Sequence, residues 1–99
     1  MSKFGDLISS SEYVLFSFYS SENNQSVLNE DLNAIAEALK NRAKVIKIDT
    51  EKNKKLTEAL RISNFPTYVL YKDEEMIWRD SNTQKADEIM HSIQQYFQE

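Results

Sequence analysis

The sequence predicts an α/β fold in which helices flank a central mixed sheet of about four strands. Stretches rich in branched and aromatic residues alternate with stretches whose apolar residues recur at helical spacing. The last two strands are separated only by a short polar turn, which predicts an antiparallel hairpin. With 99 residues, of which 40% are hydrophobic, the chain fits one domain with a single core.

The first half contains two predicted helices around one predicted strand. Phe4, Leu7 and Ile8 have helical spacing, so we expect a helix over about 3–10, ended by the serines at 9–11. The stretch EYVLFSFY over 12–19 is apolar on both faces, which is typical of a central strand. The next helix, over about 26–41, presents one apolar face made of Leu28, Leu32, Ile35, Ala36 and Leu39.

The second half contains three predicted strands and two helices. We expect strands at 44–49 (KVIKID), 67–72 (TYVLYK, directly after Pro66) and 76–79 (MIWR), with a tight turn at 73–75. The helices lie at about 52–61 and 83–98. Strands joined through helices are expected to be parallel, and the final hairpin adds an antiparallel edge.

Composition excludes several classes of function. The net charge of −4 argues against a nucleic-acid surface, and the densest basic run, EKNKK at 51–55, is interpreted as a solvated helix start. The absence of cysteine excludes dithiol chemistry, disulfides and cysteine metal sites. A single glycine, Gly5, excludes a glycine-rich phosphate loop. Because no long apolar run is present, we expect a cytoplasmic protein without membrane contact.

Three segments give the chain a resemblance to thioredoxins over about residues 4–97. YVLFSFYSSENNQS resembles the strand that leads into the family's active-site corner. VIKIDTEKNKKLTEALRI resembles the central strand, turn and helix, and SNFPTYVLYKDEEMI resembles the segment in which a cis-proline precedes a strand. The resemblance implies a thioredoxin-like fold, with Pro66 as the cis-proline and with the family's first strand missing.

The chain departs from the family at the residues that carry redox chemistry. Counted from the strand, the two family cysteines fall on Asn23 and Ser26; counted from the following helix, they fall on Glu22 and Gln25. The family's buried acid corresponds to Ser17, and no glycine follows the last hairpin. The lysine of the middle strand remains as Lys47, and without an acid at 17 we expect its ammonium to reach solvent or another carboxylate.

These losses together favour a redox-inactive protein that needs no cofactor. We expect it to bind a peptide or protein non-covalently at the former active-site corner and the cis-proline edge. The candidate binding residues are Tyr19, Glu22, Asn23, Gln25, Ser26, Phe65, Pro66 and Thr67. A plainer alternative is that the corner only caps a helix and that Pro66 only shapes a turn.

Two further alternatives come from other classes of function. A thiol transferase-like enzyme would use Tyr13, Tyr19 or Ser26 to activate an external thiol, but the chain has no length for the second domain that such enzymes carry. Ser26 has no evident base, since the sole histidine, His91, is expected on the surface of the last helix. A structural or assembly module would use the 44–49 strand as an exposed sheet edge. Lys44 and Lys47 would guard this edge, or it would pair in a homodimer.

Overall fold

The computed structural model describes residues 3–20, 33–40, 42–63, 67–81 and 86–97 and confirms the predicted order of elements. The chain runs through α1 (Lys3–Ile8), β1 (Tyr13–Tyr19), a helical segment at 33–39, β2 (Lys44–Asp49) and α3 (Lys54–Ala59). It continues through β3 (Thr67–Lys72), β4 (Glu75–Asp80), α4 (Ala86–Ile93) and a 3₁₀ turn, η1 (Gln94–Phe97). The last helix is therefore α-helical only to Ile93, and α3 is shorter than the predicted 52–61.

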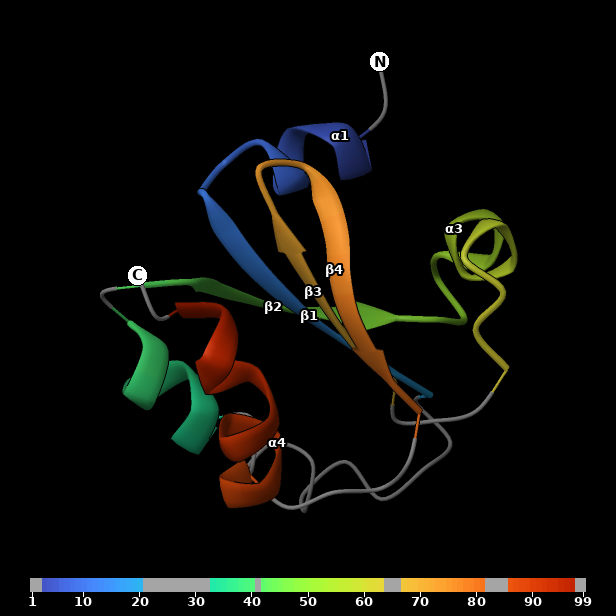
Figure 1. Ribbon diagram of the computed structural model, residues 1–99. Helices are drawn as coiled ribbons and strands as arrows, with labels where there is room; N and C mark the ends of the chain where they lie inside the picture. The colour runs from blue at the N-terminus through green and yellow to red at the C-terminus, as the bar shows by residue number, and fades with distance from the viewer. Residues whose placement is uncertain (1–2, 21–32, 41, 64–66, 82–85, 98–99) are drawn as a thin grey trace.

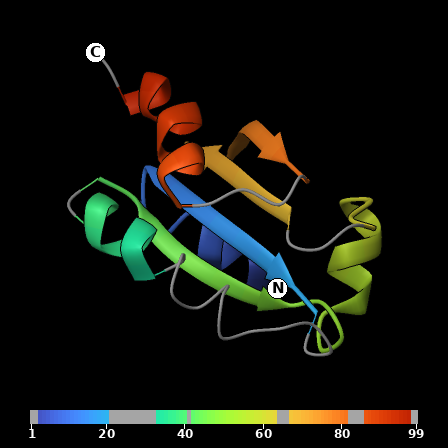
Figure 2. The same ribbon diagram turned by 90° about the horizontal axis from the view of Figure 1, so that it is seen from below.

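The four strands form one mixed sheet in the order β2-β1-β3-β4. β1 and β2 are parallel and run side by side, as Figure 2 shows, whereas β1–β3 and β3–β4 are antiparallel. This arrangement confirms both the parallel crossover and the hairpin. Within the described residues β2 is an outer strand, as expected if the family's first strand is missing.

The hairpin between β3 and β4 turns on two residues with left-handed backbone. Asp73 has φ 51° and Glu74 has φ 70°, and positive φ at both central residues fits the twist of a two-residue hairpin. Glycine usually occupies such positions because a Cβ is unfavourable there. In this chain acidic residues occupy them, so the turn also carries negative charge.

Figure 1 shows α4 and the 33–39 helix on one face of the sheet and α1 and α3 on the other. On the first face, apolar side chains of both helices meet those of β1 and β3. The buried members, all at most 8% exposed, are Leu15, Ile35, Leu39, Ala43, Tyr68, Leu70, Ile89 and Ile93. We call this the closed face, because its helices contribute fully buried side chains: Ile35, Ile89 and Ile93 are 0% exposed.

The opposite face carries an aromatic cluster under two short helices. Phe16 and Tyr71 pack edge to face with their ring centroids 5.6 Å apart, and Phe4 of α1 lies 5.0 Å from Phe16. The side chains that α1, α3 and β2 contribute are mostly half-buried: Phe4, Leu7, Ile8, Ile46, Leu56 and Leu60. We call this the open face. The strand side chains beneath, such as Phe16 and Val69, are 0% exposed, so on this face it is mainly the helical side chains that stay partly accessible.

Candidate functional site

One end of the sheet gathers the ends of β1, β2 and β4 and the beginning of β3. Tyr19 is opposite Asp49, Phe18 is opposite Thr67, and Tyr68 is opposite Asp80. The parallel and antiparallel pairings thus bring segments that are distant in sequence to the same end of the sheet. In an open α/β sheet this is the type of position at which ligands bind.

Hydroxyl and carboxylate groups line this end of the sheet. The backbone N–H and the Oγ1 hydroxyl of Thr50 both donate to the carbonyl oxygen of Tyr19, at 2.9 and 3.0 Å. The Ser20 hydroxyl donates to a carboxylate oxygen of Glu51 at 3.1 Å, and the Thr67 hydroxyl donates to Ser81 at 3.3 Å. These bonds fix the strand ends that border the former active-site corner.

The structure places two of the eight candidate binding residues. Tyr19 is half-buried at the end of β1, and the Thr67 side chain is buried at the start of β3. The other six lie outside the described residues: Glu22, Asn23, Gln25, Ser26, Phe65 and Pro66. The cis geometry of Pro66 and the register of the corner therefore stay predictions.

Ser17 occupies a position where a carboxylate would be buried. Its side chain is 2% exposed, and it pairs with Lys47 of β2 and Tyr68 of β3. Lys47 itself is exposed, as predicted, and its ammonium lies over the Tyr19 ring, 5.6 Å from the centroid. The Tyr19 ring thus attracts the Lys47 ammonium near the corner, and the sequence did not predict this contact.

Tyr13 lies at the start of β1, at the other end of this strand from the corner. Its hydroxyl donates to the backbone carbonyl of Tyr96 at 2.7 Å, and its ring is 4.4 Å from that of Phe97. Tyr13 therefore holds η1 against the sheet at the far end of β1, which does not favour Tyr13 as the thiol-activating residue of the corner; the same role for Tyr19 or Ser26 stays untested. His91 is exposed on α4, as expected.

Two described groups have shifted pKa values, and both lie away from the corner. A hydrogen bond with Tyr13, followed by the charges around it, raises the pKa of Lys72. Burial raises the pKa of Tyr71, and the positive charge of Arg79 partly offsets this shift. Within the described ranges no three histidine, aspartate or glutamate side chains gather as metal ligands would.

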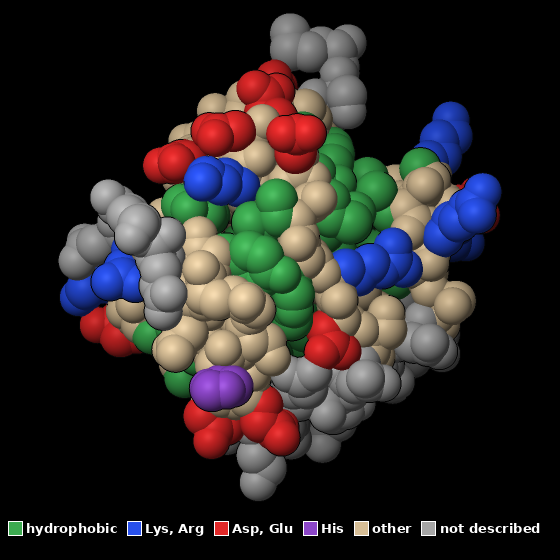
Figure 3. Space-filling view, in the orientation of Figure 1, with side chains coloured by type: hydrophobic (Ala, Val, Ile, Leu, Met, Phe, Trp, Pro, Cys, Tyr) green, Lys and Arg blue, Asp and Glu red, His purple; other side chains and the backbone are tan. Residues whose placement is uncertain are grey.

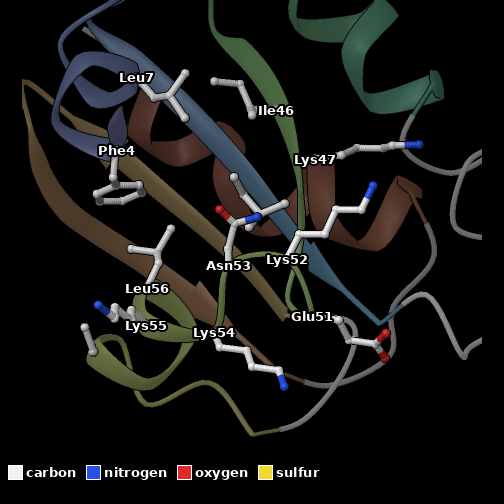
Figure 4. A pocket seen from close by; sticks show the side chains of 12 residues that line it. Phe4, Leu7, Ile46, Lys47, Glu51, Lys52, Asn53, Lys54, Lys55 and Leu56 are labelled. Atoms are coloured by element: carbon white, nitrogen blue, oxygen red, sulfur yellow. The ribbon is translucent and has the colours of Figure 1, made fainter. Parts of the chain in front are cut away.

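The open face also contains a groove, of about 870 Å³, that sequence reasoning missed. In Figure 4, Phe4 of α1 and Leu56 of α3 face each other across the groove, and Ile46 points into it from β2. The groove also borders the exposed residues Glu51, Lys52, Asn53, Lys54 and Lys55. The only early signal was the basic run at 51–55, since no pattern in the sequence shows how far apart two short helices lie.

Comparisons with known proteins agree with this architecture. The thioredoxin family model matches residues 1–95. Thioredoxin Y1, chloroplastic, of Arabidopsis thaliana is 35% identical over 63 residues, which are 64% of this chain and 37% of that protein. Thioredoxin Y2, chloroplastic, of the same plant is 34% identical over 67 residues, 68% of this chain and 40% of that protein. The chain thus matches about two fifths of the length of these relatives.

Solved structures show the same fold over most of the chain. A mutant thioredoxin from Halobacterium salinarum superposes with a TM-score of 0.80 and 27% identity, covering 100% of this chain and 87% of that one. Oxidised thioredoxin from Plasmodium falciparum gives a TM-score of 0.82 at 19% identity, covering 97% and 91%. The fold is thus that of a thioredoxin-like α/β protein.

The match to the family model covers nearly the whole sequence, and the chain belongs to the thioredoxin family. It does so without any cysteine, so the thiol–disulfide exchange of this family is not expected of it. None of the helices that the structure describes has the length and apolar character needed to cross a membrane.

Proposed function

We propose that this chain is a redox-inactive thioredoxin-family domain that binds a peptide or protein non-covalently at the former active-site corner. The observation that carries the proposal is the meeting of β1 and β3 at one end of the sheet, with Phe18 opposite Thr67, in a chain without cysteine. The strands that lead to the predicted corner are in place, while the cysteines that the family uses for redox chemistry are absent.

The composition of the corner supports binding rather than reaction. Its predicted side chains, Glu22, Asn23, Gln25 and Ser26, offer hydrogen bonds, while Phe65 and the half-buried Tyr19 offer apolar contact. Aromatic side chains beside polar groups are typical of protein-binding surfaces. An extended segment would lie against Phe65, Pro66 and Thr67 and pair through its backbone.

An insulin-reduction assay tests the first half of the proposal. With dithiothreitol present, insulin should precipitate at the same rate with and without the protein, because no sulfur is present to relay electrons. A faster rate in the presence of the protein would overturn the redox-inactive assignment and favour the transferase-like alternative. The cytoplasmic location stays a prediction, to be checked by fractionation of the source cells.

Peptide selection followed by substitution tests the second half. Peptides selected from a random displayed library on the immobilised protein should lose about tenfold or more in affinity with Phe65→Asp. Met76→Asp is the matched control, because Met76 is 40% exposed in β4 next to the distant hairpin turn. Equal affinities for wild type and Phe65→Asp would contradict binding at the corner.

A further inference from the structure

The open face carries a second surface, separate from the corner, that combines apolar contact with positive charge. The groove between α1 and α3 exposes parts of Phe4, Leu7, Ile46 and Leu56, which belong to the aromatic cluster of this face. Figure 3 shows hydrophobic side chains at the surface between α1 and the lysine-rich α3. Among the described residues, these side chains are a part of the core that stays partly accessible, which is a common feature of docking sites.

The charge around the groove is opposite to that of the whole chain. Three exposed lysines border it around the start of α3 (Lys52, Lys54 and Lys55) against one acid, Glu51, whereas the chain has a net charge of −4. Lys47 also borders the groove, but its side chain points to the other side of β2. Lys52, Lys54 and Lys55 are exposed around the start of α3, and Lys44 is exposed at the start of β2. The Ile46 and Ile48 side chains lie between these two basic regions.

β2 supplies one wall of the groove and is an outer strand of the described sheet. Lys44, Ile46 and Ile48 alternate with Val45 and Lys47, so the first set points toward α1 and α3 and the second toward the closed face. The Thr50 N–H bonds β1, so by alternation the backbone groups of Val45 point away from β1. A strand added along β2 would therefore present every second side chain to the groove.

We propose that this groove and the β2 edge bind an extended acidic segment of a partner protein. Its central side chains facing α1 and α3 would be apolar, opposite Ile46 and Leu56. Its acidic side chains would lie near Lys44 at one end, near Lys52 and Lys55 at the other, and near Lys47 on the reverse side. A segment as long as β2 spans roughly 20 Å.

A second copy of this chain is a poorer occupant of the same edge. Antiparallel pairing of β2 with itself would place Lys47 of the two copies near each other on one face of the joined sheet. It would also bring Lys44 of each copy near the exposed Lys52 of the other on the opposite face. Like charges on facing positions of paired strands are destabilising. The homodimer that the sequence suggested is therefore an outcome to be excluded by experiment rather than the occupant we propose.

The probe is a peptide of about eight residues, long enough to pair with β2, with valine at its two central groove-facing positions and glutamate at all the others. A peptide with lysine in place of glutamate is its control. In an amide-shift titration of the ¹⁵N-labelled protein, the acidic peptide should move the signals of residues 45–56, with saturation. Binding should weaken between about 50 and about 500 mM salt.

Two charge reversals of equal size test the location. Lys52→Glu should weaken binding of the acidic peptide by about fivefold or more, since it replaces an attraction by a repulsion. Lys72→Glu makes the same charge change at the other end of the sheet, on β3 beside Tyr13, and should leave binding unchanged. Leu56→Ala, checked for folding by circular dichroism, should weaken binding severalfold through lost apolar contact.

Several results would overturn the proposal. One is that the acidic and basic peptides bind with equal affinity, and another is that Lys52→Glu and Lys72→Glu weaken binding of the acidic peptide equally. The third such result is the absence of a saturable amide shift up to about 1 mM peptide. Shifts confined to Tyr19, Ser20 and Thr67 would place the acidic peptide at the corner instead. If light scattering gave the mass of a dimer, and if Lys47→Glu changed that mass, the β2 edge would be assigned to a second copy of the chain. None of these results depends on the outcome of the Phe65→Asp experiment.

Discussion

The two faces of the sheet are built from the same strands, but the helices that cover them bury their apolar side chains to different extents. On the closed face Ile35 of the 33–39 helix and Ile89 and Ile93 of α4 are 0% exposed. On the open face Phe4, Leu7 and Leu56 stay half-buried, because α1 and α3 have six residues each. The helices of the closed face are therefore fully packed, while those of the open face leave part of their apolar surface accessible, as the proposed docking of a segment requires.

The largest effect should come from truncating one side chain on each face. Ile89→Ala should lower the free energy of unfolding by about 2–5 kcal/mol, because it leaves a cavity in a fully packed region. Leu56→Ala should cost only about 1 kcal/mol, because its side chain already touches solvent and its neighbours can adjust. Urea denaturation of both variants measures the difference, and equal losses would remove the distinction between the faces.

Arg79 offers a way to loosen the open face alone. From β4 its guanidinium donates to the backbone carbonyls of Leu60 and Arg61, at 2.5 and 2.8 Å, at the end of α3. Arg79→Ala should cost about 1 kcal/mol in stability, given the exposure of the side chain. Hydrogen exchange should accelerate in α3 and stay unchanged in α4. Equal acceleration in both helices would mean that Arg79 supports the whole fold.

A stabilising substitution is available at the same helix end. Arg61 has φ 56°, and Ile62 N–H bonds the Thr57 carbonyl at 3.0 Å, a helix ending that usually contains glycine at the left-handed position. Arg61→Gly should raise the free energy of unfolding by about 0.5–1 kcal/mol, since glycine avoids the Cβ penalty of left-handed backbone. A lower urea midpoint for this variant would contradict that expectation.

The smallest effect concerns the pH dependence of stability on the open face. Burial raises the pKa of the Tyr71 phenol above its ordinary value of 10.0. Above about pH 10 the unfolded chain therefore loses a proton that the folded chain retains, so the free energy of unfolding falls as pH rises. Tyr71→Phe should make this fall shallower in urea titrations between about pH 8 and about pH 11. An unchanged slope would show that Tyr71 does not contribute.

The sequence predicted the elements of this fold better than it predicted the surfaces between them. The spacing of apolar residues identified β1, β3 and α4, because an element that is buried on one or both faces has apolar residues at regular positions in the sequence. The 3₁₀ turn that begins at Gln94 contacts Tyr13, which lies far away in the chain, and local spacing does not record such a contact. For the same reason the spacing of residues along the chain did not reveal the groove between Phe4 and Leu56.

For the candidate site, too, the sequence predicted some residues, while their contacts were seen only in the structure. The resemblance located Tyr19 and Thr67, which the structure brings to one end of the sheet. The contact of Lys47 with the Tyr19 ring and the hydroxyl bonds of Ser20 and Thr67 required three-dimensional packing. The remaining candidate residues stay predictions: Glu22, Asn23, Gln25, Ser26, Phe65 and Pro66.

The central claim is that this thioredoxin-family domain binds a partner at its former active-site corner without forming a covalent bond. The most direct measurement is an amide-shift titration with a peptide selected on the wild-type protein. The account predicts saturable shifts that are largest at Tyr19, Ser20 and Thr67 and that are fully reversed by dilution. Shifts confined to α4 and the 33–39 helix, or to the groove beside Leu56, would contradict it.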